Sequence, residues 1–160
     1  MAKLAPLLAL ALIATACGSH KAAAPPAPPT PGPGEVVYQG TAWAVTLDHG
    51  KAIALHLVGN AWKPDTTGRV KVSVLGPKPG SHGNPATPQV AAELSAGSDL
   101  AESALWVDGT ELLEKGGGLQ PTRGTIYGAP AAPLKPGKHT AIAYARTATH
   151  ATAVAWTFTT

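Results

Sequence analysis

The sequence predicts an all-β protein whose strands form an antiparallel sandwich, and three observations support this fold class. Charged residues make up only 13% of the 160 residues, against about 25% in an average soluble protein, so the chain has little of the charged surface that helices present. Short runs of β-branched and aromatic residues alternate with clusters of Gly, Pro, Asn and Asp, which is typical of strands separated by turns. Helical patterns are confined to residues 91–96 and 99–104, where Pro88, Gly97 and Gly109 interrupt them. The expected strands are Val36–Tyr38, Ala42–Leu47, Ala52–Val58, Val70–Leu75, Gln89–Leu94, Ala104–Val107, Gly124–Tyr127, Thr140–Arg146 and Ala153–Thr159.

The first 16 residues have the organisation of a secretory signal peptide. Lys3 gives the amino end one positive charge, and Leu4–Ile13 is an apolar run. The uncharged stretch from Leu4 to Cys17 has 14 residues, whereas a helix that crosses a bilayer needs about 20. We therefore expect residues 1–16 to direct export and to be removed, without a permanent transmembrane helix.

The only cysteine of the chain, Cys17, follows this run directly, in the sequence Ile13-Ala-Thr-Ala-Cys-Gly-Ser19. This sequence resembles the lipobox of bacterial lipoproteins, in which a peptidase cuts before the cysteine and the thiol then carries a diacylglycerol. The resemblance implies that Cys17 is lipidated, that the lipid bilayer is a partner, and that the protein lies on the periplasmic face of the outer membrane or on the cell surface. The family most often has Leu at the position of Ala14. Ala14-Thr-Ala16 also fits the site of ordinary signal peptidase, which would release a secreted protein.

A segment rich in alanine and proline separates Cys17 from the expected strands. Six of the chain's 16 prolines lie between Pro25 and Pro33. Such a composition cannot build a core and favours extended polyproline II geometry, at about 3 Å per residue. We therefore expect residues 17–34 to form a lipid-anchored tether.

Two structured parts are expected after the tether. Residues 35–68 are predicted to form an N-terminal β-hairpin extension, with Asp48-His49-Gly50 as its turn. Residues 69–160 are predicted to form the sandwich, with a tight turn at Asp108-Gly109 and loops at 77–88 and 133–137. About 125 residues after the tether suffice for one core but not for two ordinary domains.

Several pieces of residues 69–160 occur in an order known from one family. They are Val72–Ser81 (VSVLGPKPGS), Thr87–Leu94 (TPQVAAEL), Ser103–Leu112 (SALWVDGTEL), Leu134–Thr140 (LKPGKHT) and Ala155–Thr159 (AWTFT). In combination they resemble the bacterial immunoglobulin-like domains of cell-surface and envelope proteins. The resemblance implies an immunoglobulin-like sandwich that serves as a binding or structural module. Some members bind calcium after the penultimate strand, but residues 145–150 contain no carboxylate here, so no calcium site is expected.

Alternation within the expected strands divides their side chains between two faces. The residues expected to face the sandwich core are Leu105, Val107, Ala141, Ala143, Ala145, Val154, Trp156 and Phe158. This assignment turns Trp106, Ile142 and Tyr144 to the opposite face as an apolar patch, and a shift of one residue would reverse it. Such a patch is usually either covered or used. Residues 36–62 offer a cover, because their hairpin carries Trp43, Val45 and Leu47 on one face and ends at Trp62. An open patch would instead be a possible binding face on which glycan rings stack.

Composition and spacing argue against several kinds of partner and cofactor. Twelve basic and nine acidic residues give a net charge of +3 without a basic cluster, so we expect no nucleic-acid partner. The body lacks cysteine, and the six histidines show no metal-ligand spacing, so we expect no metal ion and no cofactor. His139, at the start of the penultimate strand, is assigned a structural hydrogen-bonding role.

No pattern typical of catalysis is present in the sequence. Gly-x-Ser-x-Gly is absent, and Gly116–Gly118 is not followed by the Lys-Ser/Thr of a phosphate-binding loop. A glycosidase would need two facing carboxylates, whereas Asp108 is expected in a turn. We therefore expect a non-catalytic, membrane-anchored lipoprotein whose partner is another envelope protein or a glycan. A carbohydrate-binding module on the Trp106, Ile142 and Tyr144 face is the alternative, followed by a small extracytoplasmic hydrolase.

Overall fold

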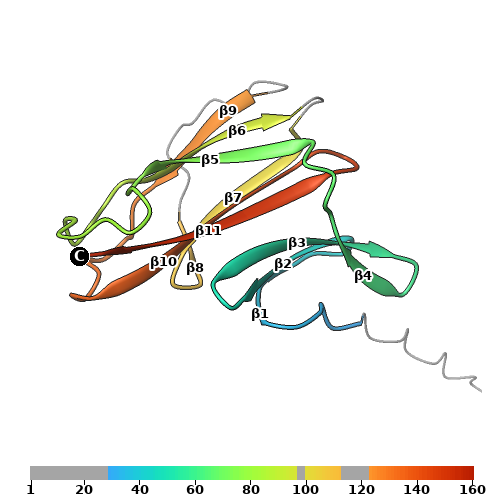
Figure 1. Cartoon of the computed structure of the whole chain (residues 1–160), viewed down its shortest axis with the longest axis horizontal. Coiled ribbons are helices and arrows are strands. Elements are labelled where there is room, and N and C mark those ends of the chain that lie inside the picture. Colours follow the sequence, from blue (N-terminus) through green and yellow to red (C-terminus); the bar gives the residue numbers. More distant parts are fainter. Residues whose placement is uncertain (1–28, 97–99, 113–122) are drawn as a thin grey trace, which may run out of the picture.

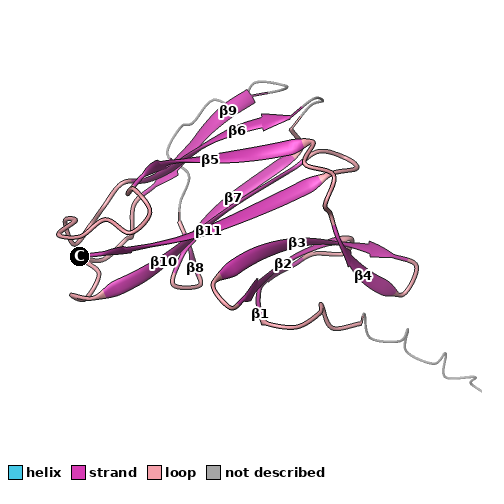
Figure 2. Cartoon of the chain, viewed as in Figure 1, coloured by secondary structure: helices cyan, strands magenta, loops and turns pink. Residues whose placement is uncertain are grey.

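The computed structural model of the chain describes residues 29–96, 100–112 and 123–160. All regular elements in these ranges are β-strands, which pair antiparallel in three sheets (Figure 1 and Figure 2). The predicted all-β class is therefore confirmed, and each expected strand is present with bounds shifted by a few residues. The strands are β1 (Glu35–Gln39), β2 (Trp43–Asp48), β3 (Lys51–Val58), β4 (Ala61–Pro64), β5 (Val70–Gly76), β6 (Val90–Ala96), β7 (Glu102–Val107), β8 (Thr110–Glu111), β9 (Arg123–Gly128), β10 (Lys138–Arg146) and β11 (Ala151–Thr159).

Two of the sheets enclose the main hydrophobic core. One has the order β5-β6-β9 and the other the order β11-β10-β7-β8. Their facing side chains form one buried cluster, in which Trp156 and Phe158 are the bulkiest members. Seven residues predicted for this face belong to the cluster, namely Leu105, Val107, Ala141, Ala143, Ala145, Trp156 and Phe158. Val154 is only half-buried.

The third sheet, with the order β1-β2-β3-β4, forms an additional layer under the sandwich (Figure 1). The hairpin expected in residues 35–68 is present as β2 and β3. It is part of a larger sheet, because β1 pairs with β2, and Ala61–Pro64 returns after Gly59-Asn60 and pairs with β3. Pro64 can occupy this strand because β4 lies at the edge of the sheet, where a missing N–H leaves no neighbour unpaired. The predicted turns are confirmed at His49-Gly50 and Asp108-Gly109, where positive φ angles allow tight hairpins.

The extra layer lies close to the sandwich because small side chains meet at the interface. β3 lies against β11, and Ala54 of β3 and Ala151 of β11 are buried in one cluster. Ala52, Ala153 and Ala155 pack around that cluster. A second hydrophobic cluster therefore joins the N-terminal sheet to the outer face of the sandwich.

The end of the proline-rich segment packs against the body. Residues 29–34 are described, and Pro31 is less than 2% exposed. The Trp62 indole Nε1 donates a hydrogen bond of 2.6 Å to the Pro29 carbonyl oxygen. The prediction that the tether extends to residue 34 is therefore wrong for these last residues, because they lie on the N-terminal sheet. The signal peptide, Cys17 and residues 18–28 lie outside the described residues.

Candidate functional site

The N-terminal sheet covers the face of Trp106, Ile142 and Tyr144, which the sequence indicated as a possible binding surface. Trp106, Ile142 and Tyr144 are 4%, 2% and 0% exposed, and they lie with Trp43 and Val45 in the second hydrophobic cluster. Their orientation away from the sandwich core agrees with the alternation in β7 and β10. The cover expected from residues 36–62 is present. A glycan therefore cannot reach these side chains in this structure, and the face is an internal interface.

Tyr38 of β1 completes an aromatic cluster on this interface. Its ring centroid lies 6.1 Å from that of Trp106 and 5.9 Å from that of Tyr144, and the latter two are 6.4 Å apart. The tilted arrangements are those that aromatic quadrupoles favour. A β-bulge between Val36 and Tyr38 interrupts the register with β2, and both Val37 and Tyr38 pack against the cluster. Strict alternation would have placed these two neighbours on opposite faces, so the bulge brings Tyr38 into the interface.

A polar network closes one side of the aromatic cluster. The Tyr38 hydroxyl donates to Glu102 Oε1 at 3.0 Å, and Arg146 Nε donates to Glu102 Oε2 at 2.6 Å. Burial and the hydrogen bond to the carboxylate raise the pKa of Tyr38. Burial also raises the pKa of Tyr144 far above its usual value. Both phenols therefore stay neutral, as an apolar interface requires.

A second polar contact joins the layers where the chain passes from β4 to β5. The Asp65 carboxylate accepts hydrogen bonds from the Ala151 amide at 2.8 Å and from the Thr67 amide at 2.9 Å. It also accepts one from the Thr67 hydroxyl at 2.7 Å, and His150 Nδ1 lies 3.3 Å away. Burial alone would raise the pKa of Asp65, but these hydrogen bonds hold it below its usual value. Asp65 thus caps the free end of β11 as an ionised carboxylate.

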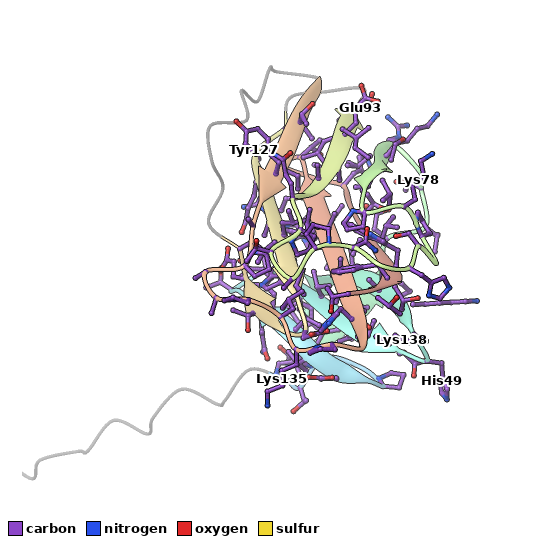
Figure 3. The ribbon with its side chains drawn as sticks, turned by 90° about the vertical axis from the view of Figure 1, so that its left-hand side faces the viewer. His49, Lys78, Glu93, Tyr127, Lys135 and Lys138 are labelled. Carbon is purple, nitrogen blue, oxygen red and sulfur yellow. The ribbon has the colours of Figure 1, made fainter. Side chains whose placement is uncertain are left out.

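A concave surface lies at the end of the sandwich near the C-terminus. A cleft of about 730 Å³ is lined by the loop before β10 and by the β7–β8 hairpin. Val107, Leu112, Pro130, Pro133 and Leu134 supply much of its apolar wall. Lys135 and Lys138 lie at its rim and are exposed, and Figure 3 views the molecule from the end that carries them. The sequence did not predict this cleft, because a proline-rich loop indicates a turn between strands and not a concave surface.

His139 borders the cleft and is held on both sides of its ring. Nδ1 lies 2.7 Å from Asp108 Oδ2, and Nε2 lies 2.9 Å from the Lys135 carbonyl oxygen and 3.2 Å from Thr160 Oγ1. Carboxylate, imidazole and hydroxyl thus stand in a row, as in a hydrolase triad. However, the Thr160 hydroxyl donates to the Lys135 carbonyl at 3.0 Å. Its proton therefore points away from the imidazole, and His139 has the structural role that the sequence predicted.

Within residues 29–96, 100–112 and 123–160, no three His, Cys, Asp or Glu side chains converge on a point that could hold a metal ion. In the same ranges the structure contains no helix that is long and apolar enough to span a membrane.

No protein-family model matches the chain, and a search of curated proteins gives no match.

Proposed function

We propose that this chain is a lipid-anchored protein of the bacterial envelope that presents a non-catalytic immunoglobulin-like module. Cys17 carries the lipid in this proposal, and the segment after it separates the membrane from the body. The position of a lone cysteine directly after an export signal supports the anchor.

The order of strands in the two facing sheets is the observation that carries the immunoglobulin-like part of the proposal. Counted from β5, the first, second and fifth strands form one sheet, and the third, fourth, sixth and seventh form the other. Immunoglobulin-like sandwiches divide their A, B, E and C, F, G strands in the same way, but constant-type domains place the fourth strand, D, with A, B and E, whereas β8 pairs with β7 here. The fold alone does not define a ligand, so the binding role needs a surface of its own.

The cleft beside the β7–β8 hairpin is the surface to which we assign binding. The Thr160 amide donates to the Gly137 carbonyl at 3.1 Å, which places the cleft loop beside the C-terminus. In Figure 1 the C-terminus and the start of the described chain lie at opposite ends of the molecule. A module held through its N-terminal segment would thus turn this cleft away from the membrane. Its apolar wall and two lysines suit a partner that inserts an apolar group flanked by an anion.

The two alternatives from the sequence receive no support from the geometry. A stacking platform for glycans would need Trp106 and Tyr144 at the surface, and both are buried. A hydrolase would need an activated nucleophile, whereas the Thr160 hydroxyl donates to a backbone carbonyl. We therefore retain the non-catalytic module as the proposed function.

Intact mass and cell fractionation of the mature protein test the anchor. We expect cleavage before Cys17, a mass increase equal to the attached acyl groups, and recovery in the membrane fraction. Cys17→Ser should abolish the added mass and the membrane recovery, while the neighbouring Ser19→Ala, as a control, should change neither. An unmodified amino-terminal Cys17 in the soluble fraction would refute the lipid anchor and favour simple secretion.

A further inference from the structure

The outer face of the N-terminal sheet is apolar but largely covered. Cross-strand partners share a face of a sheet, and the pairs Ala44↔Leu55 and Leu57↔Trp62 lie opposite to the face that carries Val45. This outer face points away from the sandwich, where solvent would be expected. Ala44 is nevertheless 0% exposed and Leu55 only 6% exposed. Another part of the chain must therefore lie over the middle of the sheet.

Residues 29–34, which we call the strap, provide this cover. One end is fixed to β4 by the hydrogen bond from Trp62 Nε1 to the Pro29 carbonyl. The other end enters β1 at Gly34, where an added Cβ would stand 2.6 Å from the Leu47 carbonyl oxygen. The strap therefore crosses from β1, over β2 and β3, towards β4, with Pro31 buried between its two ends. The blue chain beneath β1 and β2 in Figure 1 follows this path.

This crossing requires an extended chain. Four strands at a spacing of about 4.8 Å place the outer two about 14 Å apart. Residues 29–31 would span about 9 Å in polyproline II geometry, at about 3.1 Å per residue, whereas residues 32–34 bend before β1. The long Trp62 side chain bridges the rest of the distance to the Pro29 carbonyl. Pro29, Pro31 and Pro33 already have φ fixed near the polyproline II value. The strap thus loses little conformational entropy when it binds.

The contacts match the chemistry by which proteins recognise proline-rich segments. A polyproline II chain makes no internal hydrogen bonds, so its carbonyls are free to accept from a side chain. The Trp62 indole N–H donates to one of them, and an apolar surface receives the ring of Pro31. Domains that bind proline-rich ligands likewise combine aromatic side chains with a preformed extended ligand, and Trp62 is the aromatic residue that contacts the strap here.

We propose that the outer face of the β1–β4 sheet is a binding site for an extended proline-rich segment, occupied here by residues 29–33 of the same chain. Trp62 binds a backbone carbonyl by donating a hydrogen bond, and the buried middle of the sheet selects proline at position 31. The proposal does not depend on lipidation of Cys17 or on the cleft near the C-terminus. Its failure would leave the proposed anchor and module intact.

Full-length mature chain with Pro31→Ser tests the selection for proline. Pro31 is buried, whereas Pro33 is exposed, so Pro33→Ser is a matched control within the same strap. We expect Pro31→Ser to release the strap, seen as a shift of the Trp62 indole N–H resonance and faster exchange of that proton with solvent. Pro33→Ser should leave this resonance where it is in the wild type. Trp156 in the sandwich core reports in both variants that the body remains folded.

A synthetic peptide with the sequence of residues 25–34 then tests binding in trans. It should bind Pro31→Ser saturably and return the Trp62 resonance towards its wild-type position, while the same peptide with serine at position 31 should bind at least about tenfold more weakly. Trp62→Phe in the Pro31→Ser chain should weaken binding of the unmodified peptide about three- to tenfold, the effect of one hydrogen bond. The proposal is overturned if the strap stays docked with serine at position 31. It is equally overturned if the strap is released but millimolar peptide leaves the folded variant unchanged.

Discussion

The Tyr38 hydroxyl donates a hydrogen bond of 3.0 Å to the Glu102 carboxylate, across 64 residues of sequence. Tyr38 belongs to the N-terminal sheet and Glu102 to the sandwich, so this contact ties the two layers together at the edge of their shared aromatic cluster. Arg146 binds the second oxygen of the same carboxylate. The carboxylate is thus held between a cation of the sandwich and a phenol of the added layer.

Tyr38→Phe should lower the free energy of unfolding by about 1 kcal/mol, since it removes one hydrogen bond and keeps the ring in the cluster. Urea denaturation followed by circular dichroism measures this change. Tyr127→Phe is the matched control, because Tyr127 is also half-buried but its hydroxyl makes no hydrogen bond within the described residues. Equal effects of both substitutions would show that the contact between Tyr38 and Glu102 contributes nothing.

Trp106→Ala should be among the most damaging single substitutions in the chain. Removing a buried tryptophan from a packed interface costs about 3–5 kcal/mol of stability. Leu75→Ala, at a side chain that is about half exposed, should change stability by no more than about 0.5 kcal/mol. Thermal unfolding of the two variants separates an interface residue from a surface residue. A stable Trp106→Ala protein would mean that the face is open in solution.

The sequence was sufficient to predict which side chains of β7 and β10 face the sandwich core and which face away from it, because strict alternation holds in both strands. It was insufficient in the N-terminal sheet. Tyr38 reaches the interface through a β-bulge, which alternation cannot predict. β4 is short and ends in Pro64, so the sequence predicted no strand there and did not predict the four-stranded sheet. The composition of the proline-rich segment predicted an extended conformation, whereas residues 32–34 bend before β1. Composition also does not reveal whether such a segment finds a surface to bind.

Acid should weaken the junction between the layers through Asp65. Its pKa is lower in the folded chain than in the unfolded chain, where an aspartate titrates near about 3.9. The stability it contributes is therefore complete above that value and is lost as the pH falls through the folded pKa. Asp65→Asn should lower stability at pH 7 and flatten the decline between pH 5 and pH 3. Denaturation midpoints across this range measure both effects, and an unchanged pH profile in the variant would contradict the role of this carboxylate.

Gly34→Ala should destabilise the chain by about 1 kcal/mol or more, because φ at Gly34 is +103° and the new Cβ would meet the Leu47 carbonyl at 2.6 Å. Gly32→Ala is the control within the same strap, since an added Cβ there meets nothing within 4 Å. Parallel urea titrations compare the two. Similar stabilities would indicate that residues 29–34 do not enter β1 along the path described.

Proton–proton nuclear Overhauser spectroscopy of the mature protein tests the central claim, that the N-terminal sheet covers Trp106, Ile142 and Tyr144. With ring centroids 5.9 and 6.1 Å apart, the ring protons of Tyr38 should give cross-peaks to Tyr144 and to the indole of Trp106. Cross-peaks from Tyr38 that remain within the β1–β4 sheet, with none to Trp106 or Tyr144, would contradict the covered face and restore it as an exposed binding surface.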